Sequence, residues 1–120
     1  MSNNTPLVEI DLTPEYKRNL RKLSKKYRQI RLDTQAILEQ LQVRNFIGDR
    51  LSGMDEEYFI LKVRVKNSDI QKGKSAGYRL IYRVESEDSV LLLTIYSKSE
   101  REDISPNEIS SILAEFYSDE

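Results

Sequence analysis

The sequence of 120 residues predicts an α+β fold, in which a small antiparallel sheet carries an N-terminal helical hairpin on one face and is followed by a short C-terminal helix. Three observations predict it. Apolar residues recur at helical spacing between residues 14 and 43. In three stretches between residues 59 and 98, apolar and polar residues alternate with a period of two. A helix start with proline at the first helical position follows at Ser105. The length suits one domain, residues 1–120, of which we expect residues 1–6 to be disordered.

The first half of the chain predicts a strand and two helices. Residues 7–12 are mainly apolar and β-forming, and Thr13 and Pro14 then provide a helix cap and a proline at the first helical position. A second helical stretch, residues 30–43, follows without a strong breaker, so the two helices should pack as a hairpin. The first helix has a basic outer face, which an ordinary solvated helix also explains. Its basic residues are Lys17, Arg18, Arg21, Lys22, Lys25, Lys26 and Arg28.

The second half predicts three strands and a closing helix. Because side chains alternate along a strand, each strand divides its residues between two sheet faces. One face should be apolar and covered by helices, and we place Leu91, Leu93 and Ile95 together on it. The opposite face gathers a basic set with one phenol: Lys62, Arg64, Arg79, Tyr96 and Lys98. The segment Ser105–Glu108 has the form of a capping box and opens the last helix.

Composition excludes several kinds of site. The chain has no cysteine and no histidine, so disulfides, thiolate metal sites and the commonest general base are absent, and we expect neither a metal nor a cofactor. No apolar run reaches the roughly 20 residues of a membrane span. The N-terminus also lacks the layout of a signal peptide. We therefore expect a cytoplasmic protein without a membrane partner, whose chemistry relies on Lys, Arg, Tyr, Asp or Glu.

Positive charge is concentrated between residues 58 and 83. This stretch holds seven basic residues and one acid, Asp69, for a charge of +6, so the remainder carries −7 to reach the total of −1. Such a cluster focuses a field that attracts phosphates, although a solvated strand face explains the charge equally well. The seven are Lys62, Arg64, Lys66, Lys72, Lys74, Arg79 and Arg83.

Two segments, GKSAGYRLIY (residues 73–82) and LLTIYSKSEREDIS (residues 92–105), together resemble the RelE/ParE superfamily of toxins from type II toxin–antitoxin systems, most closely its RelE and HigB branch. The resemblance covers residues 7–117. It implies a metal-independent endoribonuclease, an mRNA interferase, that cuts messenger RNA on the ribosome by attack of a 2′-hydroxyl on the adjacent phosphate and so inhibits translation. It also implies a cognate antitoxin as partner, in a toxin–antitoxin hetero-oligomer.

The resemblance also implies residue roles. Arg79 matches the arginine that holds the scissile phosphate. Lys62 matches a lysine near the nucleophile, which makes it a candidate base if neighbouring cations lower its pKa. Lys98 and Tyr96 complete the expected catalytic set. The type member has a further basic residue and a tyrosine where this chain has Ser99 and Ser105, so the acid and the base stay open. Tyr96, Glu100 and Arg101 are the local groups that could substitute, as they could in the HigB branch. The expected RNA-binding residues are Arg64, Lys72, Lys74, Arg83 and Arg101.

Other readings compete with the nuclease. The ParE branch of the same fold inhibits DNA gyrase without nuclease chemistry, and a catalytically inactive, antitoxin-binding relic is a further alternative. For single residues, Arg79 and Lys62 could serve only in structural ion pairs. Tyr78 and Tyr82 fit core positions better than base-stacking ones.

Overall fold

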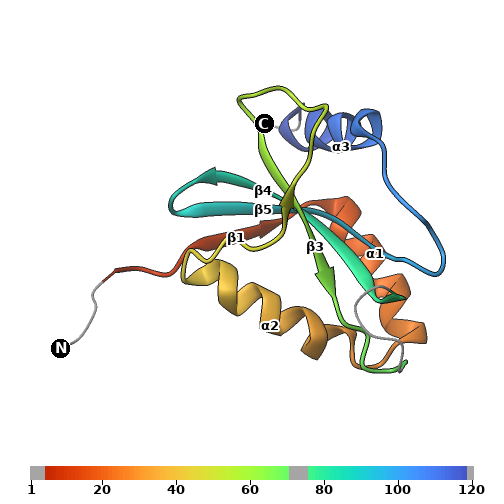
Figure 1. The fold of residues 1–120 in the computed structure, drawn as a ribbon. Coiled ribbons are helices and arrows are strands. Elements are labelled where there is room, and N and C mark those ends of the chain that lie inside the picture. Colours follow the sequence, from red (N-terminus) through yellow and green to blue (C-terminus); the bar gives the residue numbers. More distant parts are fainter. Residues whose placement is uncertain (1–4, 71–75, 119–120) are drawn as a thin grey trace.

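The computed structural model describes residues 5–70 and 76–118, and these residues form a five-stranded sheet with three helices (Figure 1). The strand order across the sheet is β1-β5-β4-β3-β2. The described residues do not include Lys72 and Lys74, which were expected to bind RNA. They also do not include residues 1–4 of the start that was expected to be disordered. The elements are β1 (Glu9–Leu12), α1 (Pro14–Lys26), α2 (Ile30–Gln42), β2 (Asp49–Arg50), β3 (Phe59–Val65), β4 (Tyr78–Ser86), β5 (Ser89–Ser97) and α3 (Pro106–Ser118).

The predicted α+β class is confirmed, but the sheet is mixed rather than purely antiparallel. Strands β2 to β5 pair antiparallel, whereas β1 pairs in parallel with β5, from Glu9 opposite Ser89 to Leu12 opposite Leu92. The parallel pairing continues into the start of α1, because the Thr13 hydroxyl donates to the Leu93 carbonyl at 2.7 Å. The same oxygen accepts the Tyr16 backbone N–H at 2.9 Å, so Thr13 caps the helix as predicted.

Helices α1 and α2 cover one face of the sheet, as expected for the predicted hairpin (Figure 1). Three residues join them, and both bury apolar side chains against the strands. Tyr78 and Tyr82 are fully buried there, which makes them core residues rather than stacking platforms. This core includes Tyr16, Leu23, Ile30, Leu41, Leu61, Val63, Leu80, Leu92 and Ile95.

The other sheet face is not the open basic surface that strand alternation predicted. It carries a second apolar cluster beneath α3, on the side of the strands away from α1 and α2. The face prediction for the last strand was wrong, because Ile81 pairs with Thr94 while Tyr82 pairs with Leu92, which leaves Leu93 as an extra residue. Such a bulge breaks the two-residue period, so Leu91 and Leu93 face α3 while Ile95 faces the hairpin. The cluster holds Ile60, Ile81, Leu91, Leu93, Tyr96, Ile104, Ile109 and Leu113.

Candidate functional site

Strand register places three of the predicted site residues in one row across the sheet. Arg64 on β3 lies opposite Arg79 on β4, and Arg79 lies opposite Tyr96 on β5. Residues directly opposite each other share a sheet face. The row therefore lies on the α3 face, at the end of the sheet beyond the apolar cluster.

Two glycines fix the strands that carry this row and the neighbouring Lys62. A Cβ on Gly77 would stand 2.0 Å from the Val65 carbonyl oxygen, so only glycine lets the start of β4 approach the end of β3 so closely. Gly48 has a φ of +116°, and a Cβ there would stand 2.7 Å from the Lys62 carbonyl oxygen. Both glycines thus serve close backbone approach beside the site.

Arg79 is buried, with 5% of its surface exposed, whereas the sequence placed it on an open surface. Its Nη1 donates to the Tyr78 carbonyl at 3.1 Å. The pKa of Arg79 is lowered, first by burial and then by the positive charge of Arg64, and the field of Tyr96 opposes this. A desolvated guanidinium beside a second one favours an anion between or above them, because the anion relieves their repulsion.

Lys62 is paired with an acid that sequence reasoning did not select. Its Nζ lies 3.5 Å from Oδ1 of Asp103, whose side chain is largely exposed. The pKa of Asp103 is lowered, chiefly by the hydrogen bond from the Ile104 backbone N–H and further by the charges of Lys62 and Lys98. Asp103 is therefore a carboxylate at neutral pH, held among the cations of the site. The only sequence signal for it was its place in the segment SEREDIS, which carries the family resemblance.

Tyr96 closes the row as a buried phenol. Its hydroxyl has no partner at hydrogen-bonding geometry among the described residues, although Asp103 is close enough to affect its titration. The pKa of Tyr96 is raised, first by burial and then by the negative charge of Asp103, while Arg79 and Arg101 act in the opposite direction. A phenol in this setting stays protonated at neutral pH and can donate a proton.

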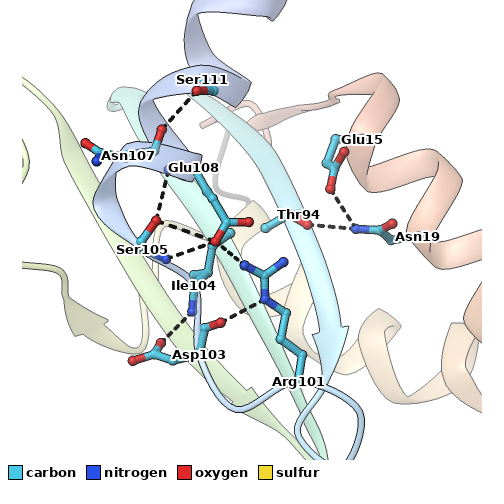
Figure 2. Close-up of polar contacts among 10 residues, drawn as sticks. All are labelled: Glu15, Asn19, Thr94, Arg101, Asp103, Ile104, Ser105, Asn107, Glu108 and Ser111. Atoms are coloured by element: carbon cyan, nitrogen blue, oxygen red, sulfur yellow. Dashed lines mark hydrogen bonds and ion pairs between the residues drawn. The ribbon is translucent and has the colours of Figure 1, made fainter.

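Arg101 contacts both Tyr96 of the row and Glu108 at the start of α3, and Figure 2 shows the contact with Glu108. Its guanidinium lies 5.7 Å from the centroid of the Tyr96 ring, and its Nε donates to the Asp103 carbonyl at 2.8 Å. It also pairs with Glu108, which belongs to the predicted capping box. That box is present, with the Glu108 N–H donating to the Ser105 hydroxyl at 3.2 Å.

Two further predicted site residues, Lys98 and Arg83, lie at different ends of the sheet. Lys98 lies at the site, where its backbone N–H donates to the Gly77 carbonyl and its Nζ to the Glu102 carbonyl at 2.6 Å. Arg83 is near the other end of β4, stacked on Tyr58 and Tyr117 at 4.6 and 5.5 Å from their centroids. The structure therefore does not bring Arg83 together with the others. We call the assembled set the cationic cluster: Lys62, Arg64, Arg79, Tyr96, Lys98, Arg101 and Asp103.

The cationic cluster can bind an anion and exchange protons with it. It combines several cations with one ionised carboxylate and one protonated phenol. Among the described residues, no group of three or more acidic side chains is arranged to hold a metal ion, and no helix is long and apolar enough to cross a membrane.

Two comparisons with known proteins gave matches, one of family and one of fold. The model of the ParE toxin of the type II toxin–antitoxin system parDE matches residues 10–102. A solved structure of a double-arginine mutant of the E. coli toxin RelE in the free state is similar in fold, with a TM-score of 0.54 and 18% sequence identity over 92% of this chain and 97% of that chain. No curated protein sequence matches significantly. Because the family model spans more than half of the residues, the chain belongs to the ParE toxin family of type II toxin–antitoxin systems, within the RelE/ParE superfamily.

Proposed function

We propose that this toxin is a ribosome-dependent mRNA endoribonuclease, and that the cationic cluster is its active site. The observation that carries the proposal is the row of Arg64, Arg79 and Tyr96, flanked by the pair of Lys62 and Asp103. A surface that only binds another protein has no need for two adjacent arginines, one of them buried, beside a carboxylate and a protonated phenol. Cleavage of RNA by 2′-hydroxyl attack needs cations to stabilise the phosphorane, a base and an acid, and these groups can supply all three.

The reaction follows from their chemistry. The 2′-hydroxyl oxygen bonds to the adjacent phosphorus while the bond from phosphorus to the 5′ oxygen breaks, leaving a 2′,3′-cyclic phosphate and a free 5′-hydroxyl. In our proposal Arg79 and Arg64 hold the phosphate oxygens, because guanidinium groups bind them through paired donors. Lys62 and Lys98 add positive charge where the phosphorane becomes more negative.

Two protons must move in this reaction. Asp103 is the carboxylate paired with Lys62, and in our proposal it takes the proton from the 2′-hydroxyl in place of Lys62, the candidate base that the family resemblance implied. Tyr96, which burial keeps protonated, gives a proton to the departing 5′ oxygen. General acid and base groups of this kind each contribute about 10²- to 10⁴-fold to rate.

The proposed partners follow from the family and from the charge. A toxin of a type II system has an antitoxin partner, and we propose that the two form a hetero-oligomer. Arg101, with Lys72 and Lys74, would contact RNA backbone near the cut, and the ribosome would present the message. We also propose that residues 1–120 act as one domain.

Gyrase inhibition is the second candidate, and the match to the ParE family model favours it. It predicts that the cationic cluster can be altered without loss of toxicity. The two functions therefore differ in whether substitutions in this cluster abolish the effect.

The deciding experiment is primer extension on a reporter message in a cell-free bacterial translation reaction. Wild-type protein should give defined cuts within codons, and Arg79→Ala, Arg64→Ala and a reaction without ribosomes should each remove them. Arg50→Ala is the matched control, since Arg50 is an exposed arginine that stacks on Phe59 and lies opposite Leu61, on the other sheet face. Because Arg79 is buried, the melting temperature of each variant must accompany the cleavage result. An intact message with folded wild-type protein would overturn the nuclease, and a supercoiling assay with gyrase would then test the second candidate.

A further inference from the structure

A cleft beside the cationic cluster has no role in the reaction just described. It lies between α1 and the end of β5 and has a volume of about 230 Å³. Tyr96 and Arg101 line this cleft and also belong to the cationic cluster, so the two sites share these residues. Its other lining residues include Asn19, Lys22, Leu23 and Ile95.

Asn19 lines this cleft, and two hydrogen bonds fix its side-chain amide (Figure 2). Its Nδ2 donates to Oε2 of Glu15 at 3.1 Å and to the Thr94 hydroxyl at 2.9 Å. These two bonds use both amide hydrogens. The Asn19 carbonyl oxygen accepts no hydrogen bond among the described residues, so an oriented acceptor remains for a ligand.

The rest of the cleft suits a flat heterocycle attached to a phosphate. Leu23 and Ile95 are buried and provide an apolar floor. Lys22 and Arg101 line the cleft as cations, and two acids, Glu15 and Glu100, line it as well. Both acids are paired with bases on α1, Glu15 with Arg18 at 3.1 Å and Glu100 with Lys26 at 3.9 Å, so the lining does not repel a phosphate. Apolar surfaces with a few fixed polar groups are typical of small-ligand sites, and single-stranded RNA is recognised by unstacked bases held in this way.

We infer that this cleft binds a nucleobase of the RNA next to the cleaved phosphate, and that Asn19 contributes to which base is accepted. The inference rests on the proposed function. The cleft is continuous with the cationic cluster through Tyr96 and Arg101, and for this reason we identify its ligand as a base of the same RNA strand. Asn19 is a specificity residue in this account. Thr94 and Glu15 are positioning residues, since they hold its amide.

The first test compares cut-site preference in the cell-free reaction for wild type, Asn19→Ala and Lys22→Ala. Asn19→Ala should leave total cleavage within a few-fold but reduce the preference at one position flanking the cut by about fivefold, as loss of one neutral hydrogen bond implies. Asn107→Ala, at an exposed asparagine in the first turn of α3, is the matched control. An unchanged preference in a folded Asn19→Ala variant would overturn the inference, because a purely structural Asn19 would lower all cuts in parallel.

The second test does not depend on cleavage, so it separates this inference from the proposed function. Hexanucleotides carrying 2′-methoxy groups, which cannot be cut, and one 4-thiouridine at each position in turn are irradiated with the free protein. Cross-linked peptides from α1 or the end of β5 are expected for one position and should be lost in Asn19→Ala and Lys22→Ala. Absence of any cross-link in these peptides would overturn the base site, even if the nuclease is real. Cross-links there from a protein that cuts no message would leave the base site standing and refute the nuclease.

Discussion

At the scale of single residues, the cationic cluster holds more positive side chains than negative ones. Burial, and after it the charge of Arg64, lowers the pKa of Arg79. Asp103 forms an ion pair with the neighbouring Lys62 at 3.5 Å. Since Asp103 is largely exposed, a phosphate can approach the same cations from solvent. Because the cluster keeps an excess of positive charge, it suits the transient binding of a polyanion better than a permanent ion pair.

Asp103→Asn should reduce single-turnover cleavage by about 10²- to 10³-fold, because the amide cannot accept the 2′ proton. The pKa of Asp103 is lowered, so in the wild type its carboxylate persists below the usual carboxyl range. The wild-type rate should therefore show no acid limb between about pH 5.5 and 7.5. The measurement is the cleavage rate against pH. A rate that falls steeply toward pH 5.5, or an Asp103→Asn variant of full activity, would assign the base elsewhere.

Gly77→Ala should destabilise the protein by about 3 kcal/mol or more, because the added methyl would meet the Val65 carbonyl oxygen and force β3 and β4 apart. Thermal unfolding measures this. Gly53→Asn is the control, since Gly53 has a φ of +82°, which asparagine tolerates at a cost of about 1 kcal/mol, and its Cβ would meet the Pro106 ring at 3.2 Å and no backbone atom. Equal melting temperatures for Gly77→Ala and wild type would show that the close approach does not position Arg79.

At the scale of elements, α3 is attached to the sheet at both of its ends. Its first turn is tied to the cationic cluster through Glu108 and Arg101. Its last turn is tied to β4, because the Tyr117 hydroxyl donates to Glu85 at 2.5 Å and accepts from Arg83 at 2.6 Å. Arg83, expected to bind RNA, therefore has structural partners that hold α3 over the second apolar cluster.

Tyr117→Phe should lower stability by about 1 to 2 kcal/mol, because these hydrogen bonds are removed. Burial and Glu85 raise the pKa of Tyr117 from 10.0 to about 12. Its phenol therefore ionises in the unfolded chain before it does in the fold, and its contribution to stability is complete below about pH 10 and disappears as the pH rises toward 12.

Urea unfolding at a series of alkaline pH values tests this, with the stability difference between Tyr117→Phe and wild type as the readout. That difference should shrink as the pH rises. A constant difference would mean that Tyr117 is held by packing alone. Buried Tyr16 has a pKa of about 12 for the same physical reason, and Tyr16 remains present in both proteins, so its contribution cancels.

Local sequence chemistry predicted the elements well, because each helix start is encoded by adjacent residues such as Thr13 with Pro14 and Ser105 with Glu108. The strands were predictable from their alternation, and so was the common face of Arg64 and Arg79, which lie on neighbouring strands. The sequence also grouped Tyr96 with these arginines, but the face that Tyr96 shares with Leu91 and Leu93 depends on the bulge at Leu93. Features that depend on pairing were not predictable. The bulge at Leu93, the parallel direction of β1 and the pairing of Lys62 with Asp103 all result from interactions between distant segments.

At the scale of the whole molecule, charge separates along the strands although the net charge is −1. The end of the sheet at Val65, Tyr78 and Ser97 holds the cationic cluster and the end of α1, where Tyr27 packs on Tyr78. The opposite end holds the acidic turns before β3 and between β4 and β5. The acids of these turns are Asp55, Glu56, Glu57, Glu87 and Asp88, and Glu85 lies beside them near the end of β4. Strands of nine residues separate the ends by about 27 Å, several times the Debye length of about 8 Å at physiological salt.

RNA affinity should therefore depend on where charge lies and not on its total. Neutralising Lys25, Lys26 and Arg28 at the cationic end to glutamine should weaken binding of a non-cleavable hexanucleotide. It should also reduce the magnitude of the slope of log affinity against log salt concentration by up to about 2. Each phosphate that the protein no longer neutralises reduces this magnitude by about 0.7. The measurement is fluorescence anisotropy of the labelled RNA over a range of salt concentrations.

The matched control neutralises Glu56, Glu57 and Glu87 at the acidic end, which changes the net charge by the same amount in the opposite sense. Because these acids lie beyond the screening distance from the cationic cluster, affinity at physiological salt should change by less than about threefold and the salt slope should stay the same. If the two triple variants shifted affinity by equal and opposite amounts, the net charge of the toxin would govern the encounter. The end of α1 would then have no specific part in holding RNA.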